Sequence, residues 1–148
     1  MPDLRSFIKA LEREGELHKV DRAVSSRFEA SAIMKEYDGK HALFFRRIND
    51  HEGVVAGICG TKKRLALSLN TTLDGLRPRI MDGIRNPQEP GVASSIQATE
   101  ELSGLSRLPI LTHFERDAAS YITSAIVSVR LPRSREENVS IHRLMIID

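Results

Sequence analysis

The amino-acid sequence predicts an α/β or α+β domain that is followed by the first strands of a β-rich domain. Three observations predict this fold class. Residues 3–85 mix apolar positions at helical spacing with short apolar runs that are typical of strands, as expected for one α/β or α+β unit. Residues 86–91, Asn-Pro-Gln-Glu-Pro-Gly, have the composition of a linker. Two strong strand patterns follow this linker, at residues 121–129 and 139–147.

The first helix is expected to follow Asp3, because an aspartate carboxylate can accept a hydrogen bond from a free backbone N–H group of the first turn. Gly15 suits the position just after a helix, where a left-handed backbone conformation is common. Residues 16–20 then predict a short strand. The apolar residues that share one face of the helix are Leu4, Phe7, Ile8 and Leu11.

A second helix is expected after Ser26, since Ser26 and Glu29 have the spacing of a capping box. The helix should end at Asp38-Gly39, because glycine is common just beyond a helix C-terminus. The next two apolar runs, at residues 42–45 and 54–59, predict strands that are joined by a polar turn.

Thr61 predicts the N-cap of a third helix, which should extend through Leu69. The three residues after the cap, Lys62-Lys63-Arg64, place positive charges where they oppose the helix dipole. They are consistent with an anion site or an acidic neighbour, but a solvent-exposed face is the favoured interpretation. Residues 73–84 predict a helix that is broken or begins late, because a proline within a helix removes a hydrogen bond.

The second half of the chain changes in character. Residues 94–102 fit a strand or a helix equally well, whereas 121–129 and 139–147 fit strands that are separated by a polar loop. We therefore expect two domains, at residues 1–93 and 94–148. The second domain is expected to be incomplete, because two strands alone are not independently stable.

Composition excludes several classes of protein. A length of 148 residues with 41% hydrophobic residues allows one buried core. No segment has the roughly 18 consecutive apolar residues of a membrane span. A net charge of +2 gives little support for binding to nucleic acid. With a single cysteine and no recognisable signal peptide, the chain is expected to be cytoplasmic.

The sequence contains no familiar catalytic or metal-binding motif. The run Gly57–Lys63 lacks the spacing of a phosphate-binding Walker loop. The five histidines do not have the spacing of a metal site. Cys59 lies in an apolar run that predicts a strand, without a base nearby in the sequence, so its thiol is expected to belong to the core.

The strand pattern that begins at Asn138 is the most informative segment for function. Alternation along a strand places Ile141 and Arg143 on one side and Asn138 and His142 on the other. Arg143 therefore interrupts an apolar row, and a buried guanidinium group needs an anion or carbonyl groups as partners. These residues alone leave both a structural salt bridge and a ligand-binding site open.

Segments along the whole chain resemble the UbiD family of prenylated-flavin-dependent decarboxylases and carboxylases. The ending His142–Met145 looks more like the archaeal members, some of which decarboxylate a phosphorylated mevalonate derivative. The similar segments, in chain order, are Asp3–Ile8, Gly15–Leu17, Ala42–Phe45, Gly57–Thr61, Leu108–His113, Tyr121–Thr123 and Asn138–Arg143.

The resemblance implies a fold and a set of site residues. The second domain would open a split β-barrel that binds prenylated FMN. Asn138 matches a ligand of the divalent metal, Mn²⁺, with K⁺ as a further ion. Ile141, His142 and Arg143 match residues that contact the flavin, and Thr123 is a further candidate for this contact. Arg143 also matches the arginine beside the substrate and is the candidate catalytic residue.

One point of geometry and one of sequence bear on this assignment. Asn138 and Arg143 are an odd number of residues apart, so both can serve one site only if the strand has a bulge or the cofactor wraps around its edge. Ala118-Ala119-Ser120 stands where the family usually has a glycine-rich turn. If that turn needs positive φ angles, each alanine there costs about 1 kcal/mol or more.

Two functions remain open from the sequence. The first is the N-terminal part or subunit of a UbiD-type decarboxylase for an unsaturated or aromatic carboxylic acid. Such a chain is expected to be inactive by itself, because the family's catalytic carboxylates and remaining metal ligands would lie beyond Asp148. The second is a non-catalytic binding or assembly module with the same fold. In both cases, exposed strand edges predict a homo-oligomer or a complementary C-terminal subunit.

Overall fold

A computed structural model describes residues 3–88, 91, 103–133 and 136–147. Its helices and strands follow the predicted order, so the mixed fold class that ends in a β-rich segment is confirmed. The expected domain boundary at residue 93 and the segment 94–102 lie outside the described residues. The elements are α1 (Leu4–Arg13), β1 (Leu17–Val24), α2 (Glu29–Glu36), β2 (Ala42–Ile48), β3 (His51–Ala56), α3 (Lys62–Ser68), α4 (Leu76–Arg85), the 3-10 helix η1 (Leu105–Arg107), β4 (Tyr121–Arg130) and β5 (Glu137–Met145).

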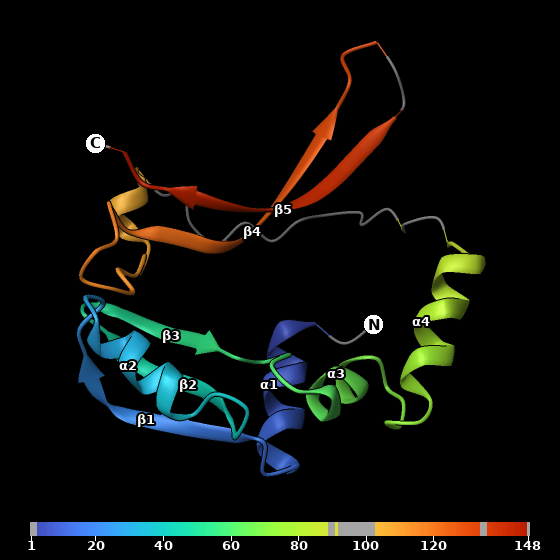
Figure 1. Ribbon diagram of the computed structural model, residues 1–148, viewed down its shortest axis with the longest axis horizontal. Helices are drawn as coiled ribbons and strands as arrows, with labels where there is room; N and C mark the ends of the chain where they lie inside the picture. Colours follow the sequence, from blue (N-terminus) through green and yellow to red (C-terminus); the bar gives the residue numbers. More distant parts are fainter. Residues whose placement is uncertain (1–2, 89–90, 92–102, 134–135, 148) are drawn as a thin grey trace.

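Strands β1, β2 and β3 form one sheet in that order. Strands β1 and β2 are parallel and β2 and β3 are antiparallel. Parallel neighbours need a crossover connection, and α2 provides it, lying over one face of the sheet (Figure 1). The buried residues that form the core of this unit are Val20, Val24, Ala30, Leu43, Phe45, Ile48 and Leu111.

The predicted N-caps of the first and third helices, Asp3 and Thr61, are confirmed. Asp3 Oδ1 accepts a hydrogen bond from the backbone N–H of Ser6 at 2.7 Å. Thr61 Oγ1 accepts one from the backbone N–H of Arg64 at 3.2 Å. Gly15, just beyond α1, has a φ of +69°, a conformation that most side chains disfavour. These local signals therefore set the ends of α1 and the start of α3.

The start of α2 differs from the prediction. The Glu29 carboxylate accepts a hydrogen bond from the backbone N–H of Ser25 at 2.7 Å, and not from Ser26. Instead, the Ser26 hydroxyl accepts a hydrogen bond from Asn49 Nδ2 at 2.7 Å. The cause is the backbone of Phe28, whose φ of +68° turns the chain just before the helix and removes the expected capping box.

The hairpin of β2 and β3 is tighter than expected, and this changes the prediction for Cys59. Ile48 pairs with His51, so only two residues form the turn, and one of them, Asn49, has a φ of +50°. Strand β3 ends at Ala56 because Gly57, with a φ of +63°, redirects the backbone. Cys59 therefore lies in a turn and is exposed, so the prediction of a core thiol was wrong.

Helix α4 begins at Leu76, in agreement with the prediction of a late-starting helix. Pro78 lies in its first turn, where the backbone N–H groups have no partner within the helix. The helix contains no buried residue. In Figure 1 it stands apart from the three-stranded sheet. Its position therefore does not depend on the core of that sheet.

The segment 108–120 connects the two sheets. Thr112 forms an isolated parallel bridge with Arg27, and Leu111 forms an antiparallel bridge with Tyr121. Leu111 is also buried in the core beside β2. Ile146, just beyond β5, donates a hydrogen bond to the Ser120 carbonyl at 3.0 Å. The base of the β4–β5 hairpin is therefore tied by backbone hydrogen bonds to the N-terminal unit.

Candidate functional site

A bulge interrupts the β4–β5 hairpin next to Arg143. Ile122 pairs with Leu144 and Ala125 with His142, so two residues of β4, Thr123 and Ser124, lie opposite one residue of β5. Such a bulge bends a strand and increases its local twist. The hairpin bends along its length in Figure 1. A bulge was one of two ways in which Asn138 and Arg143 could serve one site, but the bulge lies in β4 and not in β5 between these two residues.

The register of the hairpin fixes which side chains share a face. Strand β5 has no bulge of its own, so Arg143 and Ile141 share one face, and Asn138 and His142 share the other. Asn138 pairs with Val129 of β4. Within β5, Asn138 is five positions before Arg143, which corresponds to roughly 16 Å along a strand. The structure therefore separates Asn138 from Arg143 both along the strand and by face.

Thr123 and Arg143 line the same cavity, with a volume of about 510 Å³. This size is within the range of small-molecule sites. Tyr121 also lines the cavity, and its hydroxyl donates a hydrogen bond to Met145 Sδ at 3.1 Å. The structure thus brings together two of the predicted residues from neighbouring strands, at the point where the bulge lies.

The other predicted residues have separate surroundings. His142 Nε2 lies 2.8 Å from Ser140 Oγ, on the face that they share with Asn138. Ile141 is 77% exposed. Arg143 is exposed, and within the described part of the chain it has no ion-pair partner. A buried structural salt bridge is therefore not the role of Arg143 in this structure.

Four residues of the loop 113–117, namely His113, Phe114, Arg116 and Asp117, also line this cavity. Asp117 Oδ2 accepts hydrogen bonds from the backbone N–H groups of His113 at 3.1 Å and Phe114 at 2.9 Å, which fixes the loop. His113 and Arg116 from this loop line the cavity with Thr123 and Arg143. No site residue was predicted in this loop from the sequence, since a cavity between a loop and a strand leaves no periodic signal.

The turn before β4 does not need positive φ angles at its two alanines. Ala118 and Ala119 are not among the non-glycine residues with positive φ, which are Phe28, Asn49 and Asn70 in the described part of the chain. The alanines in place of a glycine-rich turn therefore cost no strain of that kind. Ser120 Oγ lies 2.9 Å from Thr112 Oγ1, a contact that supports the turn.

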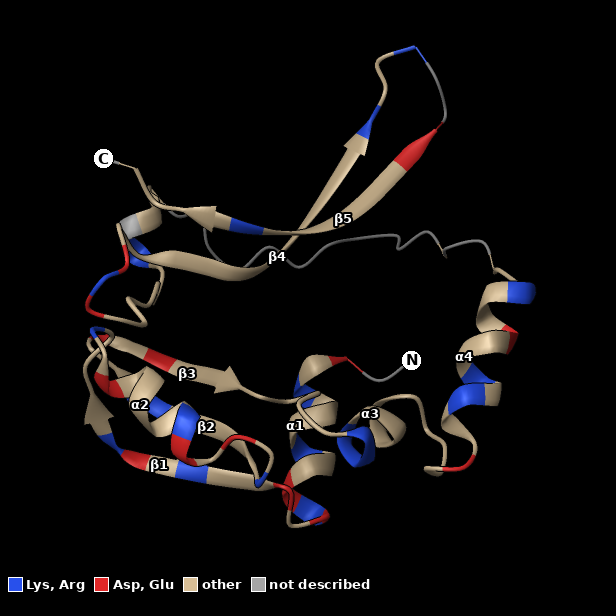
Figure 2. Ribbon diagram, in the orientation of Figure 1, with Lys and Arg blue, Asp and Glu red and all other residues tan. Residues whose placement is uncertain are grey.

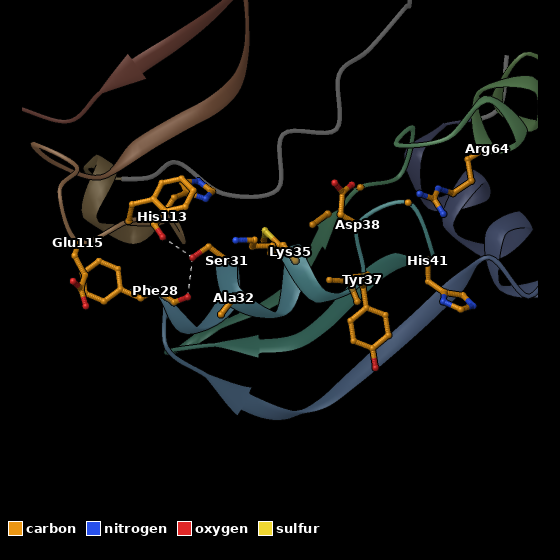
Figure 3. Close-up of a pocket in the computed structure, with 16 residues that line it drawn as sticks. Phe28, Ser31, Ala32, Lys35, Tyr37, Asp38, His41, Arg64, His113 and Glu115 are labelled. Atoms are coloured by element: carbon orange, nitrogen blue, oxygen red, sulfur yellow. Dashed lines mark hydrogen bonds between the residues drawn. The ribbon is translucent and has the colours of Figure 1, made fainter.

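A second cavity, of about 530 Å³, lies beside α2 (Figure 3). At one end Ser31 Oγ donates to the carbonyl groups of Phe28 at 2.7 Å and His113 at 2.8 Å. Arg64 lies at the other end, and Lys35 lies between them. None of the residues predicted from the sequence lines this cavity, so it is a separate candidate binding site.

The cationic run at the start of α3 has an acidic neighbour. Glu16 pairs with Lys63 Nζ at 2.6 Å and with Arg64 Nη1 at 3.3 Å, and Arg64 also donates to the Lys40 carbonyl at 3.2 Å. The hydrogen bond from Lys63 holds the pKa of the Glu16 carboxyl below its ordinary value of 4.5, and the charge of Arg64 adds to this effect. Because Arg64 is only 1% exposed, the favoured interpretation of a solvent-exposed face was wrong for this residue.

Metal-binding capacity is limited in the described residues. They contain no group of three or more His, Cys, Asp or Glu side chains that could hold a metal ion. Asn138 offers one amide oxygen, whereas Mg²⁺ and similar hard cations prefer about six ligands. The described residues therefore do not fit a complete metal site. In the same part of the chain, no helix is long and apolar enough to cross a membrane.

Comparison with protein families identifies two matching domain models. Residues 8–83 match the 3-octaprenyl-4-hydroxybenzoate carboxy-lyase N-terminal domain, UbiD_N. Residues 86–148 match the 3-octaprenyl-4-hydroxybenzoate carboxy-lyase Rift-related domain, UbiD. The two matches together cover nearly all of the chain.

The chain is similar to anhydromevalonate phosphate decarboxylases from two archaea. It is 31% identical over 146 residues to the protein from Methanothermobacter thermautotrophicus, covering 97% of this chain and 34% of that protein. It is 32% identical over 145 residues to the protein from Methanosarcina mazei, covering 97% and 33%. The chain therefore spans about a third of the length of these curated relatives.

Solved structures share the fold. The UbiD-class enzyme HmfF from Pelotomaculum thermopropionicum, in complex with prFMN, superposes with a TM-score of 0.83 at 33% identity, covering 96% of this chain and 35% of that one. The apo 3,4-dihydroxybenzoic acid decarboxylase from Enterobacter cloacae gives a TM-score of 0.85 at 22% identity, covering 99% and 35%, and supports the fold alone.

Proposed function

Because the chain belongs to the UbiD family of carboxy-lyases, we propose that it forms the N-terminal part of a decarboxylase that uses prenylated FMN. Its substrate would be an unsaturated or aromatic carboxylic acid. The observation that carries this proposal is the convergence of Thr123 and Arg143 on one cavity at the bulge. The HmfF structure with prFMN and the archaeal decarboxylases support it by similarity.

Arg143 is the proposed catalytic residue. Its guanidinium group is exposed to the cavity and unpaired among the described residues, so it can bind and orient a substrate carboxylate through two parallel hydrogen bonds. A fixed positive charge at that position also stabilises negative charge that develops during the reaction. Prenylated FMN, when bound, supplies the electron sink for loss of CO₂.

The remaining roles follow the family resemblance. We propose that Thr123, Ile141 and His142 contact the flavin, on the two faces that meet at the edge of β5. Asn138 would contribute one oxygen ligand to Mn²⁺, with K⁺ as a further ion.

Titration of the purified chain with prenylated FMN and Mn²⁺ tests the proposal. Flavin binding, followed by fluorescence, should weaken at least about tenfold in Asn138→Ala and in Arg143→Ala, the scale of one lost charge-assisted contact. Arg79→Ala is the matched control, since Arg79 lies on α4, outside the hairpin, and pairs with Asp82. No binding, or equal binding by all variants, would contradict a cofactor half-site here.

A non-catalytic binding module is the alternative. The cavity beside α2 supports it, because a ligand could bind there without any of the predicted site residues. The flavin titration separates the two functions, since a binding module of this kind would not need Asn138 or Arg143.

We also propose that the chain associates through its hairpin. Ile126 and Ile141 are paired across the strands, and both are more than 70% exposed. Val139 shares their face and is 63% exposed. Figure 2 shows that most of β4 and β5 carries no charged residue. An apolar stripe of this kind on a short two-stranded sheet is typical of an interaction surface.

Sedimentation velocity at micromolar concentration measures this association. The unmodified chain should sediment as an oligomer, and Ile141→Glu should shift it toward the monomer, because a buried unpaired charge is costly at an apolar interface. Ile84→Glu, at a 67% exposed position of α4, is the control and should leave the oligomer unchanged. A monomeric unmodified chain would argue against the proposal.

A further inference from the structure

The loop 113–117 is tied to α2 by one side chain. Ser31 Oγ lies 2.8 Å from the His113 carbonyl oxygen and 2.7 Å from the Phe28 carbonyl oxygen, and both contacts are partly buried (Figure 3). In the described part of the chain, no other side chain of residues 3–85 forms a hydrogen bond or an ion pair with this loop. Ser31 is therefore the side chain through which the N-terminal unit holds the loop.

Only one of the two carbonyl groups depends on Ser31. A serine hydroxyl has a single proton to donate. The Phe28 carbonyl also accepts a hydrogen bond from the backbone N–H of Ala32 at 2.9 Å, so it keeps a partner without Ser31. The His113 carbonyl accepts no other hydrogen bond from the described residues. Loss of the hydroxyl would therefore affect the loop more than the helix.

The remaining hydrogen bonds of the loop set its shape. Asp117 Oδ2 accepts from the backbone N–H groups of His113 and Phe114, and the backbone N–H of Asp117 donates to the Phe114 carbonyl at 3.1 Å. These bonds join residues within the loop, so they do not fix it to α2. Just before the loop, Thr112 is bridged to Arg27. Ser31 extends this attachment to His113, the first residue of the loop.

The position of the loop matters for the cavity at the bulge. His113, Arg116 and Asp117 line this cavity together with Thr123 and Arg143. If the loop were not held, it would have to become ordered when a ligand binds, and this ordering has an entropy cost. A loop that is already fixed avoids that cost and keeps the space beside Arg143 constant.

We propose that Ser31 is a positioning residue for flavin binding, because its hydroxyl holds the loop 113–117 as one wall of the cavity that contains Thr123 and Arg143. Ser31 does not line that cavity, so it acts through His113 and not by contact with the ligand. This inference rests on the proposed function, since the flavin must bind at that cavity.

Titration of the purified chain with prenylated FMN, followed by fluorescence, tests the inference. Ser31→Ala should weaken flavin binding about fivefold, the scale of one hydrogen bond. Ser68→Ala is the matched control and should leave flavin binding unchanged. Ser68 Oγ donates to the Leu65 carbonyl at 2.8 Å, three residues earlier in α3, as Ser31 does to Phe28, but it has no hydrogen bond to the loop.

Two further measurements separate positioning from a general effect on folding. Ser31→Thr keeps the hydroxyl and should restore most of the flavin affinity, because a threonine in a helix can still hydrogen-bond through Oγ1. In the flavin-free chain, the backbone N–H groups of Phe114 and Asp117 should exchange with solvent faster in Ser31→Ala than in Ser68→Ala.

Unchanged flavin binding in Ser31→Ala would overturn the inference. Equal losses in Ser31→Ala and Ser68→Ala would do the same, since they would report weaker helices and not a displaced loop. A Ser31→Thr variant that binds as weakly as Ser31→Ala, or loop exchange that is equal in the two alanine variants, would also contradict it. The proposed function fails separately, when Asn138→Ala and Arg143→Ala leave prenylated FMN binding unchanged.

Discussion

Glu16→Gln should destabilise the folded chain by about 3 kcal/mol, because it leaves the buried charge of Arg64 without its counter-ion. Arg64 is 1% exposed and the Glu16 side chain 14%, so water cannot replace the lost carboxylate easily. The expected loss is at the lower end for buried pairs, since the Lys40 carbonyl still accepts a hydrogen bond from Arg64 Nη1. Urea unfolding followed by circular dichroism measures the change.

Glu12→Gln is the matched control for this substitution. Glu12 pairs with Lys19, and both side chains are about half exposed. Exposed pairs contribute less than about 1 kcal/mol, so this variant should lose much less stability than Glu16→Gln. Equal losses in the two variants would show that Arg64 does not depend on Glu16.

The same pair should make stability depend on pH. The pKa of Glu16 is lowered in the folded state, so the unfolded chain binds more protons in the acidic range and stability rises with pH. This contribution is complete above the ordinary value of 4.5 and is lost as pH falls through the folded pKa. The difference in stability between the unmodified chain and Glu16→Gln should therefore shrink below about pH 4.5. A difference that stays constant with pH would contradict the pairing.

Phe45→Ala should destabilise the chain by about 3–5 kcal/mol, the largest effect expected of a single core substitution here. Phe45 is fully buried on the central strand β2, between β1 and β3, and belongs to the main core cluster. Removing its ring leaves a cavity that the sheet and α2 can fill only by moving. A loss of this size is a large fraction of the stability of a typical domain. Urea unfolding measures it.

Phe114→Ala provides the control for loss of a phenyl ring. Phe114 is 66% exposed, so its ring gives up little buried surface. The expected change is within about 0.5 kcal/mol, as for most surface substitutions. If Phe45→Ala cost no more than Phe114→Ala, the packing of β2 against α2 would not be the source of stability.

The candidate site could be predicted only in part. Family resemblance pointed to Thr123 and Arg143, and both line one cavity. His113 and Arg116 were missed, because their proximity to Arg143 depends on the loop that Ser31 and Asp117 hold. The bulge in β4 was not predicted, since strand alternation cannot tell which of two partner strands carries an extra residue.

The sequence by itself determined the features that arise from neighbouring residues. Asp3 and Thr61 cap their helices through residues three positions away, and apolar spacing placed most helices and strands. Only the tertiary structure decided the burial of Arg64, which depends on Glu16, far away in the sequence. It likewise decided the exposure of Cys59 and the cavity between the 113–117 loop and β5. The physical reason is that caps and periodicity are local interactions, whereas burial and charge pairing depend on which distant segments the fold brings into contact.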